Sequence, residues 1–321
     1  METNRNSNII KLKQNLKYRN ILIDAFPLLG LIIIILFFTI ITSGNLLTLN
    51  NLKIILNQMF LYLIGGLGSV YLYAQGGIDV SMASNIGFSA ILGVRIMYQH
   101  VGIGIIATLL IGSSIGLLMG IIYAYAGIPV FIQGLAMDFL LKGTLYPLSG
   151  FKASIPVPDR LLKFDNKYFA WIFLLIIFIF IFFTYNFSRF GKECRSIGAG
   201  EIASIQSGIK VKKNKVLAFF ISGLTCGIVA VYTLIRTGSA SQSTGLGFNF
   251  NVMLSLVLGG CVLGGGNGVK VRNAVIGAVT FVVLQNGLVL CGASARAQDI
   301  VKGILFVLMI VFTSKMYERK V

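Results

Sequence analysis

Charged residues are scarce in this chain, and acidic residues are the scarcest. Only 12% of the 321 residues are charged, and 10 Asp and Glu stand against 27 Lys and Arg. A soluble domain carries about a quarter charged residues. Because 56% of the residues are hydrophobic and the mean hydropathy is +0.87, the chain has too few charges to cover a water-facing surface. Water is therefore not its main solvent.

Motifs for nucleotide or metal chemistry are missing from the sequence. The glycine run GGCVLGGGNGVK at 259–270 lacks the Lys-Ser/Thr ending of a phosphate-binding loop. There is no nucleophile elbow, no HExxH and no close pair of carboxylates, and neither the lone His100 nor the four cysteines have metal-ligand spacing. We predict that the chain is not an enzyme and binds no cofactor or metal, so uphill transport would draw its energy from a partner or an ion gradient.

What the chain does have is a succession of apolar segments of membrane-spanning length. The plainest read AFPLLGLIIIILFFTII and FAWIFLLIIFIFIFFTY. They predict an all-α polytopic membrane protein, a single transmembrane domain over residues 1–321. The ten predicted spans are 25–42, 54–74, 80–98, 102–125, 129–148, 168–185, 216–235, 249–265, 271–291 and 299–314. The first is longer than a signal-peptide core, so we interpret it as a retained helix.

The net charge of +17 reports orientation rather than nucleic-acid binding. With the N-terminus inside and ten spans, 17 of the 27 Lys and Arg fall on the inner side. This is the positive-inside bias of membrane proteins. We therefore predict a basic cytoplasmic N-terminus at 1–20, a cytoplasmic C-terminus, an inner loop at 186–215 and no nucleic-acid partner.

Two sets of glycines recur at four-residue spacing. They are Gly112, Gly116 and Gly120, and then Gly260, Gly264 and Gly268. This spacing predicts a groove on one helix face, where a second helix can approach closely. The second set also predicts a helix break near an inner loop.

Polar side chains at membrane depth are costly and often functional. The candidate translocation-pathway residues are Asp79, Ser81, Asn85, Gln133, Asp138, Gln285 and Asn286. If several of them converge, they would suit a hydroxyl-rich solute better than an ion.

Four of these residues also have a structural interpretation. Asp79 follows two glycines and can accept a hydrogen bond from the backbone N–H of Ser81 or Met82 as an N-cap, which we favour over direct solute contact. Asp138 can pair with Lys142, four residues on, and this pair is as well supported as a solute contact. The amides at 285–286 can bond across helices.

The segment SRFGKECRSIGAGEIASIQSGIKVKKNK, from Ser188 to Lys215, is the substantial inner loop. Residues 201–208 can form a short helix bounded by glycines, thin enough to lie in a groove of another protein. The alternative is a solvated basic loop attracted to anionic lipid headgroups, which composition alone favours.

Six motifs follow one another along the chain. They are GNLLTLNNLKIILNQ (44–58), GGIDVSMAS (76–84), GIPVFIQGLA (127–136), SIGAGEIASIQSGIKVKKNK (196–215), LGGCVLGGGNG (258–268) and QNGL (285–288). With these motifs, nearly the whole chain resembles the permease subunit of ribose-type (monosaccharide) ABC importers, within the larger group that includes branched-chain amino acid permeases.

The resemblance implies a permease homodimer or heterodimer in the lipid of the bacterial cytoplasmic membrane. An ATPase subunit carrying ATP and Mg would dock on each inner loop, and a solute-binding protein would deliver a simple sugar or similar polar solute at the outer face. The docking residues it implies are Gly198, Gly200, Glu201, Ala203, Ser204, Ser207 and Gly208.

Two other transport functions stay open at this point. One is an ABC permease for nucleosides or branched-chain amino acids. The other is an ion-coupled secondary transporter with Asp79 or Asp138 as its coupling site. A membrane-embedded transferase would need a cluster of catalytic polar residues, which the sequence does not show.

Overall fold

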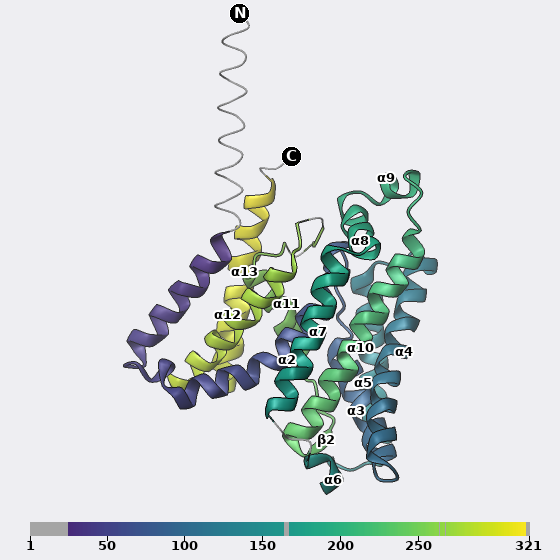
Figure 1. The fold of residues 1–321 in the computed structure, drawn as a ribbon. Helices are drawn as coiled ribbons and strands as arrows, with labels where there is room; N and C mark the ends of the chain where they lie inside the picture. Colours follow the sequence, from purple (N-terminus) through teal and green to yellow (C-terminus); the bar gives the residue numbers. More distant parts are fainter. Residues whose placement is uncertain (1–24, 164–166, 263, 267, 319–321) are drawn as a thin grey trace, which may run out of the picture.

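The computed structural model describes residues 25–163, 167–262, 264–266 and 268–318 and is built almost entirely of helices (Figure 1). In chain order its elements are a first helix (Ala25–Ile41), η1 (Asn45–Leu47), α2 (Leu49–Ala74), α3 (Met82–Met97), α4 (Val101–Ala126), α5 (Val130–Leu148), β1 (Ser154–Pro156), α6 (Asp159–Leu162), α7 (Lys167–Asn186), α8 (Arg189–Ala199), α9 (Glu201–Gln206), α10 (Val211–Thr237), β2 (Ser239–Ser241), α11 (Phe248–Leu258), α12 (Val271–Leu290) and α13 (Ala295–Glu318). Each of the ten predicted apolar segments overlaps one of these helices.

Only some of the helices are long and apolar enough to cross a membrane on their own. Within the described residues these are α2, α4, α10 and α12, and the pair α7–α8 would add a fifth span, bent by 60°. The first helix, α3 and α11 are apolar but shorter. The polytopic helical fold is thus confirmed, whereas ten full spans stay a prediction.

Two local expectations were wrong. The predicted span 249–265 is a helix of 11 residues, because α11 ends at Leu258 and Gly260 adopts a φ of +89° just beyond it. Gly264 and Gly268 consequently lie in a loop and form no helical groove, although the predicted helix break is present. The structure also contains a small antiparallel ribbon that the sequence did not predict, in which Ile155 of β1 faces Ala240 of β2.

The helices form two groups that share α2 (Figure 1). On one side α3, α4, α5 and α10 pack together and α7 packs against α2, and on the other α11, α12 and α13 lie beside the first helix. The start of the first helix, the end of α13, and α8 and α9 lie toward the same end of the molecule, while α6 and β2 lie at the opposite end. This arrangement agrees with the predicted orientation, in which both termini and the inner loop share one side.

The glycine groove predicted on α4 packs against α10. An added Cβ on Gly112 would lie 2.8 Å from the carbonyl oxygen of Gly223, and one on Gly120 would lie 2.8 Å from Cα of Val216. An added Cβ on Gly116 would overlap the carbonyl oxygen of Phe219. The two backbones therefore touch along several turns, as small-residue spacing predicts.

Gly116→Ala should destabilise the protein, because the new methyl group has no room between α4 and α10. Overpacking of this kind costs about 1–3 kcal/mol. The measurement is the melting temperature of the detergent-purified protein. Gly143→Ala is the matched control, since Gly143 is helical and exposed with nothing within 4 Å of its added Cβ. Equal melting temperatures for both variants would contradict the close packing.

Candidate functional site

The turn between α2 and α3 centres on a buried carboxylate. Oδ1 of Asp79 accepts hydrogen bonds from the backbone N–H of Ser81 at 2.9 Å and from its hydroxyl at 2.6 Å. Oδ2 accepts one from the hydroxyl of Ser222, on α10, at 3.0 Å. The φ of +82° at Gly76, a conformation that glycine tolerates best, opens this turn.

The structure confirms the predicted hydrogen bond from the Ser81 N–H to Asp79, but Asp79 is not the N-cap of α3. The N-cap of α3 is Ser81, so Asp79 lies two residues before it and stabilises the turn rather than the first helical turn. Its bond to Ser222 spans 143 residues of sequence. A solute contact by Asp79 stays a prediction.

Two further helices hold the same turn. The side-chain amide of Asn249, on α11, donates to the carbonyl oxygen of Val80 at 2.9 Å. On α5, Gly134 approaches so closely that an added Cβ would lie 3.1 Å from the backbone nitrogen of Val80. Neither Ser222 nor Asn249 was among the predicted site residues. Asn249 could have been included, because it is an amide side chain within the predicted span 249–265.

Two of the predicted pathway residues bind the backbone of α4. The amide of Asn85 donates to the carbonyl oxygen of Gly112 at 3.2 Å, and its own oxygen accepts from Ser89 at 3.0 Å. The amide of Gln133 donates to the carbonyl oxygen of Met119 at 2.8 Å. Both side chains are buried and tie α3 and α5 to α4.

Two buried acceptor atoms on α5 have no hydrogen-bond donor among the described residues. Nζ of Lys142 binds Oδ2 of Asp138 at 2.6 Å, which confirms the predicted pair. Oδ1 of Asp138 and Oε1 of Gln133 are buried and have no hydrogen-bond partner within the described part of the chain. A buried acceptor without a donor is costly. These two atoms could accept from a donor that enters from outside the chain.

The last two candidates belong to the other group of helices. Oδ1 of Asn286 accepts from the amide of Asn51, on α2, at 2.8 Å. Gln285 is hydrogen-bonded to the Tyr62 hydroxyl, which is also on α2. The predicted bonds across helices are confirmed. The seven candidates therefore form two sets on either side of α2 and do not converge on one point.

The inner loop folds as predicted, with a short helix between glycines. Gly200 separates α8 from α9, and Gly208, with a φ of +79°, turns the chain toward α10. Nζ of Lys215 binds Oε1 of Glu201 at 2.7 Å and lies 4.4 Å from the ring centroid of Tyr123, at the end of α4. This ion pair fixes α9 against α10 and α4.

The predicted docking residues differ in their accessibility. Glu201, Ala203, Ser207 and Gly208 are exposed. Ser204 is buried, and Gly198 is packed so tightly on α2 that an added Cβ would overlap the carbonyl oxygen of Ala74, so neither offers a free surface.

Two exposed apolar side chains of α9 were not among the predicted docking residues. Ile202 is 75% exposed and Ile205 is 57% exposed, and the two lie one helical turn apart. Their spacing of three residues in a polar, basic loop was the signal available for finding them.

The inner loop connects directly to the turn that holds Asp79. Gln75, at the end of α2, donates to Sγ of Cys194 on α8 at 3.0 Å and to the carbonyl oxygen of Asn214 on α10 at 3.1 Å. The backbone N–H of Gly266 donates to the carbonyl oxygen of Tyr73 at 2.8 Å. The end of α2 is thus bonded to α8, α10 and the glycine-rich loop, one residue before the turn begins.

Comparison with known proteins gives a family match over most of the chain. The model of the family described as branched-chain amino acid transport system / permease component matches residues 51–310. Ribose import permease protein RbsC of Escherichia coli (strain K12) is 28% identical over 289 residues, which cover 85% of this chain and 88% of that protein.

Two relatives carry other sugar names. Galactose/methyl galactoside import permease protein MglC of Haemophilus influenzae is 27% identical over 343 residues, which cover 98% of each chain. D-allose transport system permease protein AlsC of Escherichia coli (strain K12) is 26% identical over 297 residues, which cover 86% of this chain and 87% of that protein. No solved structure matches the chain significantly.

Asp79→Ala should lower both yield and melting temperature, because it removes the acceptor of three buried donor groups. Each buried donor left unpaired costs about 1–3 kcal/mol. Ser222→Ala removes only the bond to α10, leaves one oxygen of the buried carboxylate unpaired and should cost about 1–3 kcal/mol. Thermal unfolding of the purified variants measures both. If Asp79→Ala keeps the wild-type yield and melting temperature and loses only solute uptake, Asp79 belongs to the pathway instead.

Proposed function

The chain belongs to the branched-chain amino acid transport system / permease component family, and on this premise we propose that it is the permease of an ABC importer for a simple sugar. The solute would be a ribose-like monosaccharide or a similar polar molecule, carried across the bacterial cytoplasmic membrane. Three relatives, each aligned over more than four-fifths of this chain, are named as permeases for ribose, galactose or allose. Their agreement on monosaccharides supports the solute class.

A separate ATPase would supply the energy and would dock on α9, which we call the docking helix. The observation that carries this proposal is the exposure of Ile202 and Ile205 on a polar part of the chain. Exposed apolar side chains that lie together on a rigid element are typical of a contact with another protein. The ion pair of Glu201 with Lys215 holds the helix in place for that contact.

ATP and Mg would then bind to the partner and not to this chain. The sequence has no phosphate-binding loop, and in its glycine-rich run the backbone N–H of Gly266 is bonded to Tyr73 near the end of α2. Two permease chains, identical or closely related, would each receive one ATPase subunit on their docking helix.

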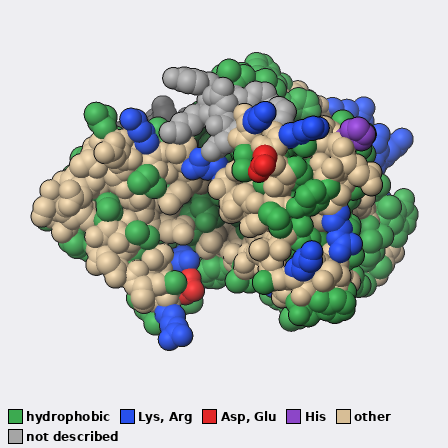
Figure 2. Space-filling view, turned by 90° about the horizontal axis from the view of Figure 1, so that it is seen from below, with side chains coloured by type: hydrophobic (Ala, Val, Ile, Leu, Met, Phe, Trp, Pro, Cys, Tyr) green, Lys and Arg blue, Asp and Glu red, His purple; other side chains and the backbone are tan. Residues whose placement is uncertain are grey.

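The opposite end of the molecule would receive a solute-binding protein. Seen from that end, the surface shows more Lys and Arg than Asp and Glu (Figure 2). In the described part of the outer loop, residues 149–163, the exposed charged residues are Lys152, Arg160, Lys163 and the acid Asp159. A basic surface attracts a partner whose contact surface is acidic, which mainly raises the rate of association.

We place the solute pathway along α5. The uncommitted oxygens of Gln133 and Asp138 lie on that helix, and a sugar supplies hydroxyl donors that suit them. The side chains of Asp79, Ser81 and Asn85 already have hydrogen-bond partners within the protein. They would therefore hold the helices around the pathway in place and would not bind the solute. Oδ1 of Asp138, which has no hydrogen-bond partner, could instead bind a coupling ion. An ion-coupled transporter is therefore the second candidate function.

The double variant Ile202→Ser/Ile205→Ser should lose the ATPase subunit, because it removes the apolar contact of the docking helix. In the complex the partner would bury both isoleucine side chains. Their loss should then cost at least about 2 kcal/mol of binding free energy, which is a roughly thirtyfold weaker complex. The measurement is the amount of ATPase that co-purifies with the permease from native membranes. Gln206→Ser, an exposed polar change on the same helix, is the control and should retain the partner.

The same purification tests the solute class. A solute-binding protein recovered with the complex should bind monosaccharides and not leucine. Wild-type recovery of the ATPase by the double variant would rule out this docking surface, and a binding protein specific for leucine would move the solute to branched-chain amino acids.

A further inference from the structure

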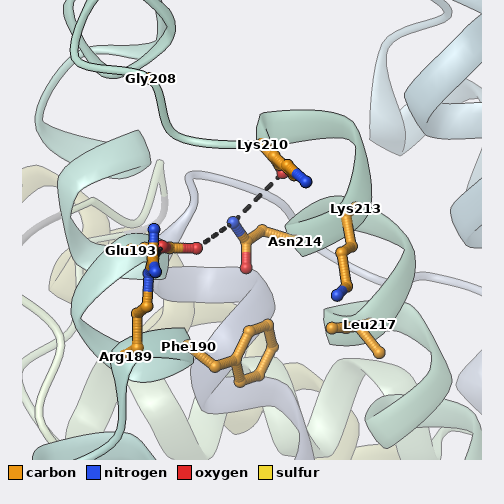
Figure 3. Close-up of a pocket in the computed structure, with 8 residues that line it drawn as sticks. All are labelled: Arg189, Phe190, Glu193, Gly208, Lys210, Lys213, Asn214 and Leu217. Atoms are coloured by element: carbon orange, nitrogen blue, oxygen red, sulfur yellow. Dashed lines mark hydrogen bonds and ion pairs between the residues drawn. The ribbon is translucent and has the colours of Figure 1, made fainter.

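A pocket of about 300 Å³ lies between α8 and the start of α10, beside the docking helix (Figure 3). Three of its lining side chains are cationic: Arg189 from α8, Lys210 from the residue before α10, and Lys213 from the first turn of α10. Phe190 and Leu217 lie on the side opposite Gly208 and provide an apolar floor. The pocket thus combines positive charge with an apolar surface.

The one carboxylate in the pocket is already bound. Oε1 of Glu193 accepts from Nε of Arg189 at 2.7 Å, and Oε2 accepts from the amide of Asn214 at 2.7 Å. The hydrogen bonds from Asn214 and Arg189 lower the pKa of Glu193, so its carboxyl stays ionised. Among the described residues, Lys210 and Lys213 form no salt bridge. With three cations against one anion, the pocket attracts a further anion.

The pocket lies where the apolar surface of a membrane helix ends. Exposed apolar side chains form a stripe along one face of α7, comprising Ile172, Leu175, Ile176, Ile179, Phe180 and Phe183. The stripe continues to Phe187, two residues before Arg189, where the chain bends by 60° into α8. Leu217, 36% exposed near the start of α10, adds apolar surface on the other side of the pocket. A lipid lying along α7 would therefore bring its headgroup to the level of the pocket.

We propose that this pocket binds the phosphate group of an acidic phospholipid at the inner face of the membrane. Lys210 and Lys213 would contact the phosphate, and Phe190 and Leu217 would contact the start of the acyl chains. The apolar floor and the stripe on α7 favour a lipid over free phosphate, which offers no apolar part to cover them. The bound lipid would lie at the junction of α8 and α10, from which the docking helix projects, whatever solute the protein carries.

Lys213→Gln tests the site. The full-length purified permease is titrated in detergent with phosphatidylglycerol or phosphatidylcholine, and bound lipid is counted by native mass spectrometry. The wild-type protein should prefer phosphatidylglycerol. A basic residue near a membrane surface contributes about 1 kcal/mol, so the variant should bind it about fivefold more weakly and bind phosphatidylcholine equally well. Because Lys213 is exposed, the variant should fold normally.

Lys192→Gln is the matched control, because Lys192 is exposed on α8, carries the same charge and does not line the pocket. It should change phosphatidylglycerol binding by less than twofold. Equal losses in both variants would mean diffuse attraction and would overturn the proposal. Displacement of the lipid by millimolar inorganic phosphate would assign the pocket to a free anion. Normal lipid binding by Lys213→Gln together with loss of the ATPase would assign it to the partner protein.

Discussion

A polar group that is buried away from water needs hydrogen-bond partners within the protein. The carboxylate of Asp79 has such partners at the point where several helices meet. Two of its three hydrogen bonds come from Ser81, the N-cap of α3, and one comes from Ser222, so one side chain closes the turn at 76–81 and connects it to α10. Asn249 adds α11 through the carbonyl oxygen of Val80. The contact of α10 with this turn therefore depends on a single acidic residue in a chain that has only ten, while α11 is held by Asn249.

The same turn lies one residue beyond the contacts of the inner loop. Gln75 is bonded to α8 and α10, and Lys215 on α10 holds the docking helix through Glu201. A displacement of the docking helix would consequently be carried by α8 and α10 to the end of α2 and then to the turn at 76–81. We propose that an ATPase at the inner face would act through this short hydrogen-bonded connection on the helices of the proposed solute pathway, including α5.

Features that depend on local composition or on regular spacing could be predicted from the sequence. The ten apolar segments, the groove at Gly112, Gly116 and Gly120, and the short helix between Gly200 and Gly208 all follow from composition or spacing, and the structure contains each of them. The sequence was insufficient where the deciding contact is distant. Nothing near Asp79 indicates Ser222, 143 residues away, and nothing near residue 155 indicates pairing with residue 240. The end of α11 at Leu258 was missed because the apolar run continues past it and only the backbone at Gly260 stops the helix.

We propose that ATP on a partner subunit drives a sugar through this permease, with α9 as the point of contact. The most direct measurement is uptake of labelled ribose, galactose and allose into vesicles that contain the permease, its ATPase and its binding protein. We predict uptake of at least one sugar that requires ATP on the ATPase side and persists when an ionophore removes ion gradients. Uptake without the ATPase, abolished by the ionophore, would contradict the claim and identify an ion-coupled transporter.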